Sequence, residues 1–364
     1  MHISSFQALY PNLHRLSESP DMLDTTKENF TSLAQLNLFQ PATKSSFFLY
    51  EIQTPFRTHR GLLACVDVMD YLNSSIKKHE ATMPQEEQKQ MQLTLERDAA
   101  VKPILLIYPN AARIDDWMAH YIQQNPHFLE LPFLEDTQIH RLWQVQEAAA
   151  IEALHHLFLE EVPHAYIADG HHRMAAMGLL AQSENVDWQQ RFRSVYVALF
   201  PASELDILEF NRVVEVPTDF HRQQLESLFE IKPLSAAAKP RQLHEMTLCT
   251  PQGWFQLHWK SAVLRAFAHE PAVLDTVLLN EKILKEMIGI NDVRHDRRVE
   301  YVDAQAGLEA IQHKVLGNPH RIGFCLYPVT FNDLLTLVEA GKTLPPKSTW
   351  FAPRMKNGLI VKPY

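Results

Sequence analysis

The hydrophobic and polar positions of the chain form short blocks that predict strands and helices mixed together. Residues 47–52 and 61–68 are apolar runs on either side of a polar segment, which predicts a β-hairpin. The apolar runs at 103–108 and 194–200 predict buried strands, and the residues at 85–99 favour a polar helix. Because the strands and helices interleave without a regular βαβ rhythm, we expect a mixed α/β or α+β fold.

The second half of the chain has a different rhythm, with a predicted hairpin, four helices and a strand. The hairpin is predicted at 246–259, the helices at 220–229, 274–288, 306–315 and 331–340, and the strand at 322–327. A change of pattern near residue 213 suggests a boundary. We therefore expect one portion at 1–212 and a further α/β portion at 213–364.

The segment Asp169-Gly170-His171-His172-Arg173 follows a short apolar strand and opens a predicted helix. Glycine permits a tight turn, and the free N–H groups of a helix's first turn can hold a phosphate. Cationic side chains there oppose the helix dipole, so their presence suggests an anionic ligand. The alternative is a surface helix start with incidental histidines.

Composition narrows the range of partners. The chain has 364 residues and a net charge of −9, which argues against a protein that coats nucleic acid or an anionic membrane. Its three cysteines are far apart, so a disulfide framework or zinc cluster is not expected. No apolar run is long enough to cross a bilayer, and the first residues do not resemble a signal peptide. We expect a cytoplasmic protein of undetermined oligomeric state.

Two further patterns suggest a metal site and a P-loop, but their spacing does not fit either. The histidines around residues 155–172 lack the i, i+4 spacing of a helical metal pair, so a transition-metal site is not expected. Gly341-Lys342-Thr343 follows a predicted helix instead of opening one, which excludes a P-loop. Lys347-Ser348-Thr349, between two prolines and Trp350, is a donor-rich loop that either closes over phosphates or acts as a structural clamp.

Five ordered blocks together resemble the domain-of-unknown-function 1015 family. The resemblance spans about residues 45–360, and its blocks are 70–82, 140–143 (His140 to Trp143), 168–173, 211–214 and 345–354. That family is similar to the free serine kinases built on the ParB/sulfiredoxin fold. The resemblance therefore implies a ParB/sulfiredoxin-like catalytic core and a nucleotide-binding turn at the start of a helix.

Carried over by motif, the resemblance implies that Glu80 is the catalytic base and that Asp169 is a second acid and a Mg²⁺ ligand. Phosphate or nucleotide would be held by Gly170, His171, His172, Arg173, Lys347, Ser348 and Thr349. Possible pocket residues are His79, Thr82, Arg141, Asn211 and Arg212, with Arg354 a weaker candidate. For Arg141, Asn211, Arg212 and Arg354, a salt-bridge or structural role is an equal alternative.

The function that we expect is a kinase for a small hydroxyl compound, first of all L-serine, which would yield O-phosphoserine. The phosphate donor would be ATP, ADP or pyrophosphate, with Mg²⁺ as cofactor. Two alternatives remain open: a ParB-like nucleotide-binding regulatory module without transfer chemistry, and a phosphate-ester hydrolase.

Overall fold

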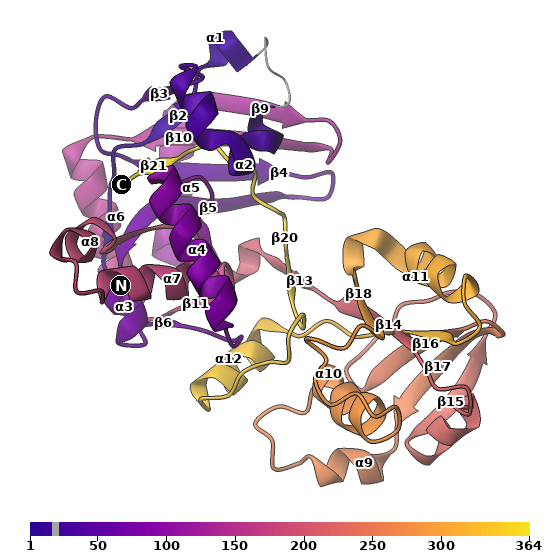
Figure 1. Cartoon of the computed structure of the whole chain (residues 1–364). Coiled ribbons are helices and arrows are strands. Elements are labelled where there is room, and N and C mark those ends of the chain that lie inside the picture. The colour runs from indigo at the N-terminus through magenta and orange to yellow at the C-terminus, as the bar shows by residue number, and fades with distance from the viewer. Residues whose placement is uncertain (17–21) are drawn as a thin grey trace. The chain divides into compact units, whose positions relative to one another are not determined.

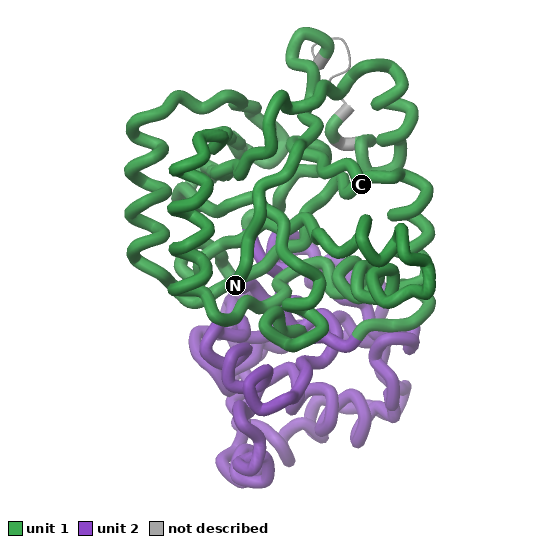
Figure 2. The backbone as a smooth tube through the Cα atoms, turned by 90° about the vertical axis from the view of Figure 1, so that its left-hand side faces the viewer, with its two compact units in different colours: residues 1–78, 82–206, 353–364 green, residues 79–81, 207–352 purple. Residues whose placement is uncertain are grey.

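Strand pairing builds two large sheets, one of nine strands and one of six, and each belongs to its own compact unit (Figure 2). The computed structural model describes residues 1–16 and 22–364. Unit 1 consists of Met1–Lys78, Thr82–Asp206 and Pro353–Tyr364, and unit 2 consists of His79–Ala81 and Ile207–Ala352. The expected mixed α/β fold is confirmed.

The nine-stranded sheet of unit 1 has the order β6-β11-β8-β12-β5-β4-β10-β9, with β1 paired to β5 (Figure 1). Its strands are β1 (Ile3–Ser4), β4 (Phe47–Gln53), β5 (Thr58–Asp67), β6 (Ile76–Lys77), β8 (Ile104–Tyr108), β9 (Leu129–Phe133), β10 (Gln138–Val145), β11 (Ala165–Asp169) and β12 (Ser194–Pro201). The predicted hairpin is confirmed, because β4 and β5 pair antiparallel with Phe48 opposite Leu63. The sheet is mixed, since β12 pairs parallel to β8 whereas β11 pairs antiparallel to it.

Two small sheets and a set of helices complete unit 1. The small sheets pair β2 (Leu9–Pro11) with β3 (Phe39–Pro41), and β7 (Ala99–Ala100) with β21 (Lys362–Pro363). The helices are α1 (Leu13–Leu16), α2 (Met22–Gln35), α3 (Val68–Leu72), α4 (Pro84–Arg97), α5 (Ala112–Gln124), α6 (Ala148–Glu161), α7 (His171–Ala181), α8 (Val186–Arg191) and the 3₁₀ turn η1 (Ala202–Glu204).

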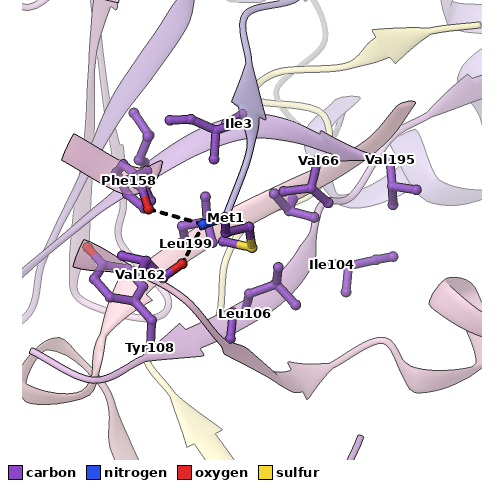
Figure 3. Close-up of a cluster of buried hydrophobic side chains, with 14 of the residues drawn as sticks. Met1, Ile3, Val66, Ile104, Leu106, Tyr108, Phe158, Val162, Val195 and Leu199 are labelled. Carbon is purple, nitrogen blue, oxygen red and sulfur yellow. Dashed lines mark hydrogen bonds between the residues drawn. The ribbon is translucent and has the colours of Figure 1, made fainter. Parts of the chain in front are cut away.

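The main core of unit 1 lies between the sheet and helices α5, α6 and α7. Each helix contributes apolar residues at helical spacing, such as Leu154 and Phe158 from α6, to the same buried cluster. Figure 3 shows Met1 among the side chains of this cluster. Its ammonium group donates hydrogen bonds to the carbonyl oxygens of Phe158 (3.2 Å) and Val162 (2.6 Å). These two carbonyl oxygens at the C-terminal end of α6 thereby have a hydrogen-bond donor.

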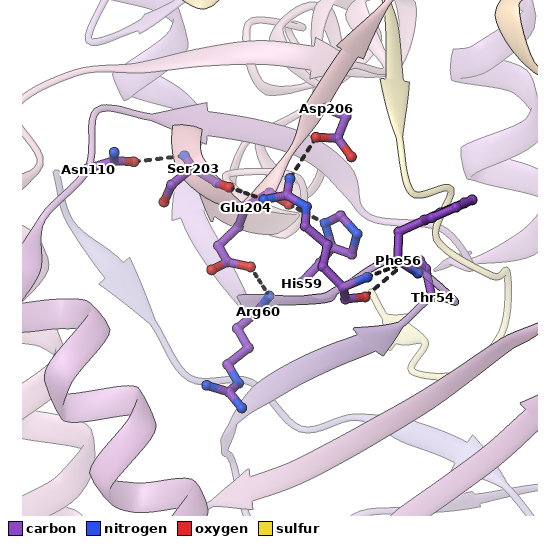
Figure 4. Close-up of polar contacts among 9 residues, drawn as sticks. Thr54, Phe56, His59, Arg60, Asn110, Ser203, Glu204 and Asp206 are labelled. Atoms are coloured by element: carbon purple, nitrogen blue, oxygen red, sulfur yellow. Dashed lines mark hydrogen bonds and ion pairs between the residues drawn. The ribbon is translucent and has the colours of Figure 1, made fainter.

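A polar cluster fixes the end of β12 to the tip of the β4–β5 hairpin (Figure 4). Glu204 accepts a hydrogen bond from the backbone of Arg60 at 2.8 Å, and its carbonyl oxygen lies 2.8 Å from Nδ1 of His59. Arg57 pairs with Asp206 at 2.8 Å. These contacts hold the last residues of unit 1 before the chain continues into unit 2 through β13 (Asp206–Leu208).

Unit 2 has a six-stranded sheet with the order β15-β17-β16-β19-β14-β18. Its strands are β14 (Phe210–Glu215), β15 (Phe229–Leu234), β16 (Glu245–Thr250), β17 (Gly253–Trp259), β18 (Val299–Asp303) and β19 (Arg321–Cys325), and β20 (Trp350–Ala352) lies outside this sheet. The helical segments are η2 (Arg222–Ser227), α9 (Ser261–Ala266), α10 (Asp275–Leu278), the π-helix η3 (Leu279–Lys285), η4 (Ala304–Ala306), α11 (Gly307–Leu316) and α12 (Phe331–Glu339).

The division between the units falls at Asp206 and Ile207, and the C-terminal segment Pro353–Tyr364 belongs to unit 1. The boundary suggested by the sequence pattern, after residue 212, lies within strand β14. Among the helices of the described residues, none combines the length and apolar character that a membrane span requires.

Candidate functional site

The turn between β11 and α7 has the backbone geometry that the sequence predicts for it. β11 ends at Asp169, Gly170 has a φ of 100°, and α7 begins at His171. The backbone conformation favours glycine, and a Cβ atom at residue 170 would lie 2.7 Å from Nη2 of Arg173 and would displace the guanidinium. The first turn of α7, with its backbone N–H groups, therefore lies beside the Arg173 side chain.

The antiparallel pairing of β8 with β11 brings a second segment to this turn. Asp169, at the end of β11, lies opposite Leu105 near the start of β8, so the residues before β8 reach the start of α7. Arg173 Nη1 donates to the carbonyl oxygens of Lys102 (2.8 Å) and Pro103 (2.7 Å). The guanidinium is thereby fixed in position by backbone groups.

The C-terminal segment of unit 1 brings a third cationic residue. β21 pairs antiparallel with β7, and the Gly358 N–H donates to the carbonyl oxygen of Val101 at 2.9 Å. This pairing runs the segment alongside residues 99–101. Arg354 therefore reaches the turn, where its Nη1 lies 3.4 Å from Oδ1 of Asp169.

Three cationic groups surround one carboxylate at this place. Asp169 Oδ2 lies 2.9 Å from Arg173 Nη2 and 3.2 Å from Lys102 Nζ, and Oδ1 faces Arg354. Three positive charges against one negative charge leave an excess of two. The side chains of Asp169, Lys102 and Arg173 keep 24–32% of their surface exposed, so an incoming anion can reach them. We call these four residues the cationic cluster.

The charges of the cationic cluster change the acidity of its members. Burial opposes ionisation of Asp169, but Arg173, Lys102 and Arg354 outweigh it and hold the pKa of its carboxyl below the usual range. Burial lowers the pKa of Lys102, and Asp169 opposes that shift by attraction. A carboxylate with a lowered pKa is a weak proton acceptor, so this geometry favours Asp169 as a group that orients the cations.

The two histidines of the turn have different surroundings. His171 is buried. The Met83 N–H donates to Nε2 of His172 at 3.2 Å, so Nε2 carries the lone pair and the proton of the neutral ring is on Nδ1. His172 therefore anchors the start of α4, whose N-cap is Met83, directly after Thr82. A role for His171 and His172 in phosphate binding stays a prediction.

Several other candidates lie together in unit 2. The Leu344 N–H donates to the His79 carbonyl oxygen at 2.7 Å, and the His79 ring nitrogen Nε2 lies 3.2 Å from Oγ1 of Thr349. Glu80 follows His79 and lines a cavity of this unit. The short segment His79–Ala81 is thus tied to the loop at 344–349.

The loop that contains Lys347 and Ser348 is held by internal contacts. Lys347 has a φ of 55°, and its Nζ lies 5.2 Å from the centre of the Phe210 ring. The Ser348 hydroxyl donates to the Pro345 carbonyl oxygen at 2.7 Å. These contacts match the structural-clamp alternative, while phosphate binding by Lys347, Ser348 and Thr349 stays a prediction.

Asn211 and Arg212 are buried residues of β14 with structural partners. Asn211 Oδ1 accepts a hydrogen bond from the Leu326 N–H at 3.0 Å. The guanidinium of Arg212 donates to the carbonyl oxygens of Phe210 and, at 3.1 Å, of Lys347. Burial lowers the pKa of Arg212 to about 10, so the group remains charged at neutral pH. Arg212 therefore supports the shape of the 345–349 loop.

Arg141 does not lie with the cationic cluster. It is on β10, and four strands separate β10 from β11 in the sheet, which corresponds to about 20–25 Å at the usual strand spacing. Its guanidinium instead pairs with Glu51 at 3.0 Å and with Glu130 at 2.5 Å. The ion-pair alternative is the one that the structure contains.

Sequence reasoning missed Lys102 and gave Arg354 little weight. Lys102 has no motif around it; the only signal was its place directly before the predicted strand at 103–108. Arg354 closes the last block of the resemblance, but its distance from Asp169 in the sequence gave no reason to join the two. The pairing of β8 with β11 and of β21 with β7 makes both contacts.

Asp169 does not fit well as the principal ligand of Mg²⁺. Both of its oxygens already face cationic groups, and a dication placed there would meet three positive charges. Mg²⁺ in phosphoryl-transfer sites is held largely by phosphate oxygens and water. Mg²⁺ stays a prediction, and no step is assigned to it below.

Comparison with known proteins identifies the family. The model of a family described as a protein of unknown function, DUF1015, matches residues 7–278. This match covers well over half of the chain, so the chain belongs to the DUF1015 family. The resemblance seen in the sequence motifs is thereby confirmed. A comparison with curated proteins gave no match.

Several solved structures are similar to this chain at 12–13% sequence identity. SbnI with a C-terminal truncation from Staphylococcus aureus is 13% identical, covers 82% of this chain and 87% of its own, and has a TM-score of 0.43. A free serine kinase variant in complex with ADP is 12% identical, covers 82% and 92%, and has a TM-score of 0.39. A conserved hypothetical protein from Pyrococcus furiosus is 13% identical, covers 82% and 95%, and has a TM-score of 0.39. At these TM-scores the likeness assigns no ligand and no residue role to this chain.

Proposed function

We propose that this protein transfers a phosphoryl group from a nucleotide or pyrophosphate to the hydroxyl group of a small free metabolite, with L-serine as the first candidate. The observation that carries the proposal is the cationic cluster at the N-terminal end of α7. In a chain with a net charge of −9, a local excess of two positive charges at the N-terminal end of α7 attracts a phosphate.

The members of the cationic cluster have separate roles in this proposal. Arg173 is fixed by the Lys102 and Pro103 carbonyl oxygens and by Asp169, so it presents a preoriented guanidinium. Lys102 and Arg354 contribute two further cationic groups, which lie 3.2 Å and 3.4 Å from the Asp169 carboxylate. Phosphoryl transfer depends chiefly on positioning and on stabilising the charge of the transferred group, which are the two properties that this arrangement provides.

The proton of the acceptor hydroxyl needs a base, and the family motif proposes Glu80. In the transfer step the acceptor oxygen forms a bond to the phosphorus while the bond between phosphorus and the donor's bridging oxygen breaks. The hydroxyl proton passes to the Glu80 carboxylate, and the donor leaves as the shortened nucleotide or as phosphate. Serine is the first candidate acceptor because the sequence motifs resemble those of free serine kinases.

The proposal is tested with purified full-length protein, Mg²⁺ and L-serine, with ATP, ADP or pyrophosphate in separate reactions followed by phosphorus NMR. We expect a phosphoserine resonance with one of the donors. Arg354→Met should reduce the rate and the donor affinity at least about tenfold, because a charge-assisted contact to phosphate contributes roughly 1.5–3 kcal/mol. The matched control is Arg113→Met, which removes an exposed arginine paired with Glu160 and Glu161.

Other outcomes of the same experiment identify the alternatives. Nucleotide binding that depends on Arg354 without any product would indicate a regulatory binding module. Release of free phosphate without phosphoserine would indicate a hydrolase. Donor binding and transfer that are equal in the wild type and in Arg354→Met would remove the cationic cluster from the function.

A further inference from the structure

Unit 2 contains a cavity of about 710 Å³, which is within the size range of small-molecule sites. Its lining includes three ion pairs, of Lys342 with Glu270 (2.5 Å), Lys285 with Glu281 (2.8 Å) and Arg294 with Asp292 (3.3 Å). Glu80 is a fourth acid of the lining. Four acidic against three basic residues leave an excess of one negative charge, which disfavours a phosphate and favours a cationic group.

One residue of the cavity wall has an unsatisfied polar atom. Asn280 lines the cavity, and its Oδ1 is shielded from solvent and has no hydrogen-bond partner among the described residues. A buried acceptor without a donor destabilises a protein by about 1–3 kcal/mol. Asn280 lies in the π-helix Leu279–Lys285, a conformation that occurs frequently at functional sites. Both features are expected where the side chain turns its oxygen toward the cavity and a ligand there supplies the missing donor.

The helix that carries Asn280 is held firmly at its start. Asp275 accepts hydrogen bonds from the His244 N–H at 3.1 Å and from Nε1 of Trp259 at 3.0 Å. These bonds join α10, which continues into the π-helix, to β17 and to the turn before β16. The surrounding structure therefore holds the unusual backbone of residues 279–285 in place. Unusual backbone conformations at functional sites persist for the same reason.

We propose that this cavity binds the acceptor by its ammonium group, with the Asn280 side chain turning its amide oxygen toward that group. The identification of the ligand as the acceptor rests on the proposed function; the recognition of an ammonium-bearing small molecule does not. Glu80, the proposed base, lines the same cavity. A ligand with its hydroxyl on the carbon next to the amine-bearing carbon would therefore hold that hydroxyl in the cavity that Glu80 lines. An amino alcohol or a hydroxy amino acid has this arrangement.

The binding preference is measured by isothermal titration calorimetry of the full chain in the absence of a phosphate donor, so that no transfer contributes heat. The probes are L-serine, ethanolamine, which keeps the ammonium and the hydroxyl, and L-glycerate, in which a hydroxyl replaces the ammonium at the same configuration. We expect L-serine and ethanolamine to bind and L-glycerate to bind at least tenfold more weakly. Equal binding of L-glycerate and L-serine, or no binding of either amine, would overturn the proposal.

Substitutions at Asn280 locate the binding in this cavity. Asn280→Leu should weaken L-serine binding at least tenfold, whereas Asn280→Asp, which adds a negative charge with nearly the same shape, should retain or strengthen it. The matched control is Asn332→Leu, at an exposed position of α12 outside the cavity lining. Wild-type affinity in Asn280→Leu, or loss of binding in both Asn280 variants while ADP binding and thermal unfolding stay normal, would contradict the assignment.

The outcome is separable from that of the proposed function. Amine binding that depends on Asn280, without any phosphoryl transfer, would support the cavity and reject the kinase. Phosphoserine formation that is unchanged in Asn280→Leu would support the kinase and reject the cavity as the acceptor site. ADP binding depends on the cationic cluster, so it reports on unit 1 independently of either result.

Discussion

A Cβ atom at Gly170 would lie 2.7 Å from Nη2 of Arg173, whose guanidinium is held by the carbonyl oxygens of Lys102 and Pro103. Gly170 also has a φ of 100°, which an L residue adopts only with strain. The turn and the guanidinium are therefore coupled: a side chain at residue 170 displaces the group that we expect to face phosphate.

Gly170→Ala should lower both stability and donor binding. The positive φ alone costs roughly 1–2 kcal/mol, and the contact with Arg173 adds to it. Displacement of the guanidinium should weaken ADP binding about tenfold or more, since each factor of ten corresponds to about 1.4 kcal/mol. Urea unfolding measures the first effect and calorimetric titration with ADP the second.

The matched control for that prediction is Gly307→Ala. Gly307 has a φ of 74° but no heavy atom near its Cβ position. The substitution should reduce stability by backbone strain and leave ADP binding unchanged. An equal loss of ADP binding in both variants would show that strain, and not the contact with Arg173, is responsible.

Asp169→Asn should separate binding from transfer. Removal of the carboxylate charge leaves Lys102, Arg173 and Arg354 more attractive to phosphate, so ADP affinity should be equal or higher. The amide cannot accept from all three cations, so their orientation should be lost and the transfer rate should fall at least about tenfold. Calorimetric titration with ADP measures the affinity, and phosphorus NMR measures the transfer rate. A wild-type transfer rate in the variant would exclude a positioning role for Asp169.

Stability should depend on pH through Asp275. Burial raises the pKa of its carboxyl from 3.8 to about 7. The folded protein therefore holds a proton that the unfolded chain releases, and this contribution to stability is fully present below about pH 3.8. It is lost progressively as the pH rises toward 7, by an amount on the order of a few kcal/mol.

Asp275→Asn removes this dependence. The amide does not titrate, so the free energy of unfolding of the variant should change less between pH 4 and 8 than that of the wild type. One amide oxygen cannot replace both carboxylate oxygens, so a hydrogen bond from His244 or Trp259 is lost, and at pH 4 the variant should be the less stable protein. Urea titrations followed by tryptophan fluorescence test this, with the exposed Asp219→Asn as control. Parallel pH profiles for the wild type and Asp275→Asn would refute the assignment.

Arg212→Lys should destabilise unit 2 and leave the cationic cluster intact. A lysine retains the charge but cannot donate to the carbonyl oxygens of Phe210 and Lys347 together, and it loses the planar contact with the Tyr301 ring at 5.1 Å. We expect a loss of about 1–3 kcal/mol in the free energy of unfolding.

The control for this variant is Arg265→Lys on α9, at an exposed position. ADP binding should be unchanged in both variants, because the cationic cluster belongs to unit 1. A loss of ADP binding in Arg212→Lys alone would instead assign Arg212 a part in the donor site.

The local patterns of the sequence determined the elements and the centre of the candidate site. The hairpin of β4 and β5, the strand β11 and the start of α7 after Gly170 all follow from short-range periodicity and from the conformational freedom of glycine. Asp169 and Arg173 are neighbours for a local reason too, because only the turn at Gly170 and the first residues of α7 separate them.

Only the tertiary structure decided which distant residues join that centre. Lys102 reaches Asp169 because β8 pairs antiparallel with β11, and Arg354 reaches it because β21 pairs with β7. Arg141 lies apart because four strands intervene between β10 and β11. Strand order depends on packing and hydrogen bonding between segments far apart in the chain, and a periodic pattern within one segment carries no information about its partner.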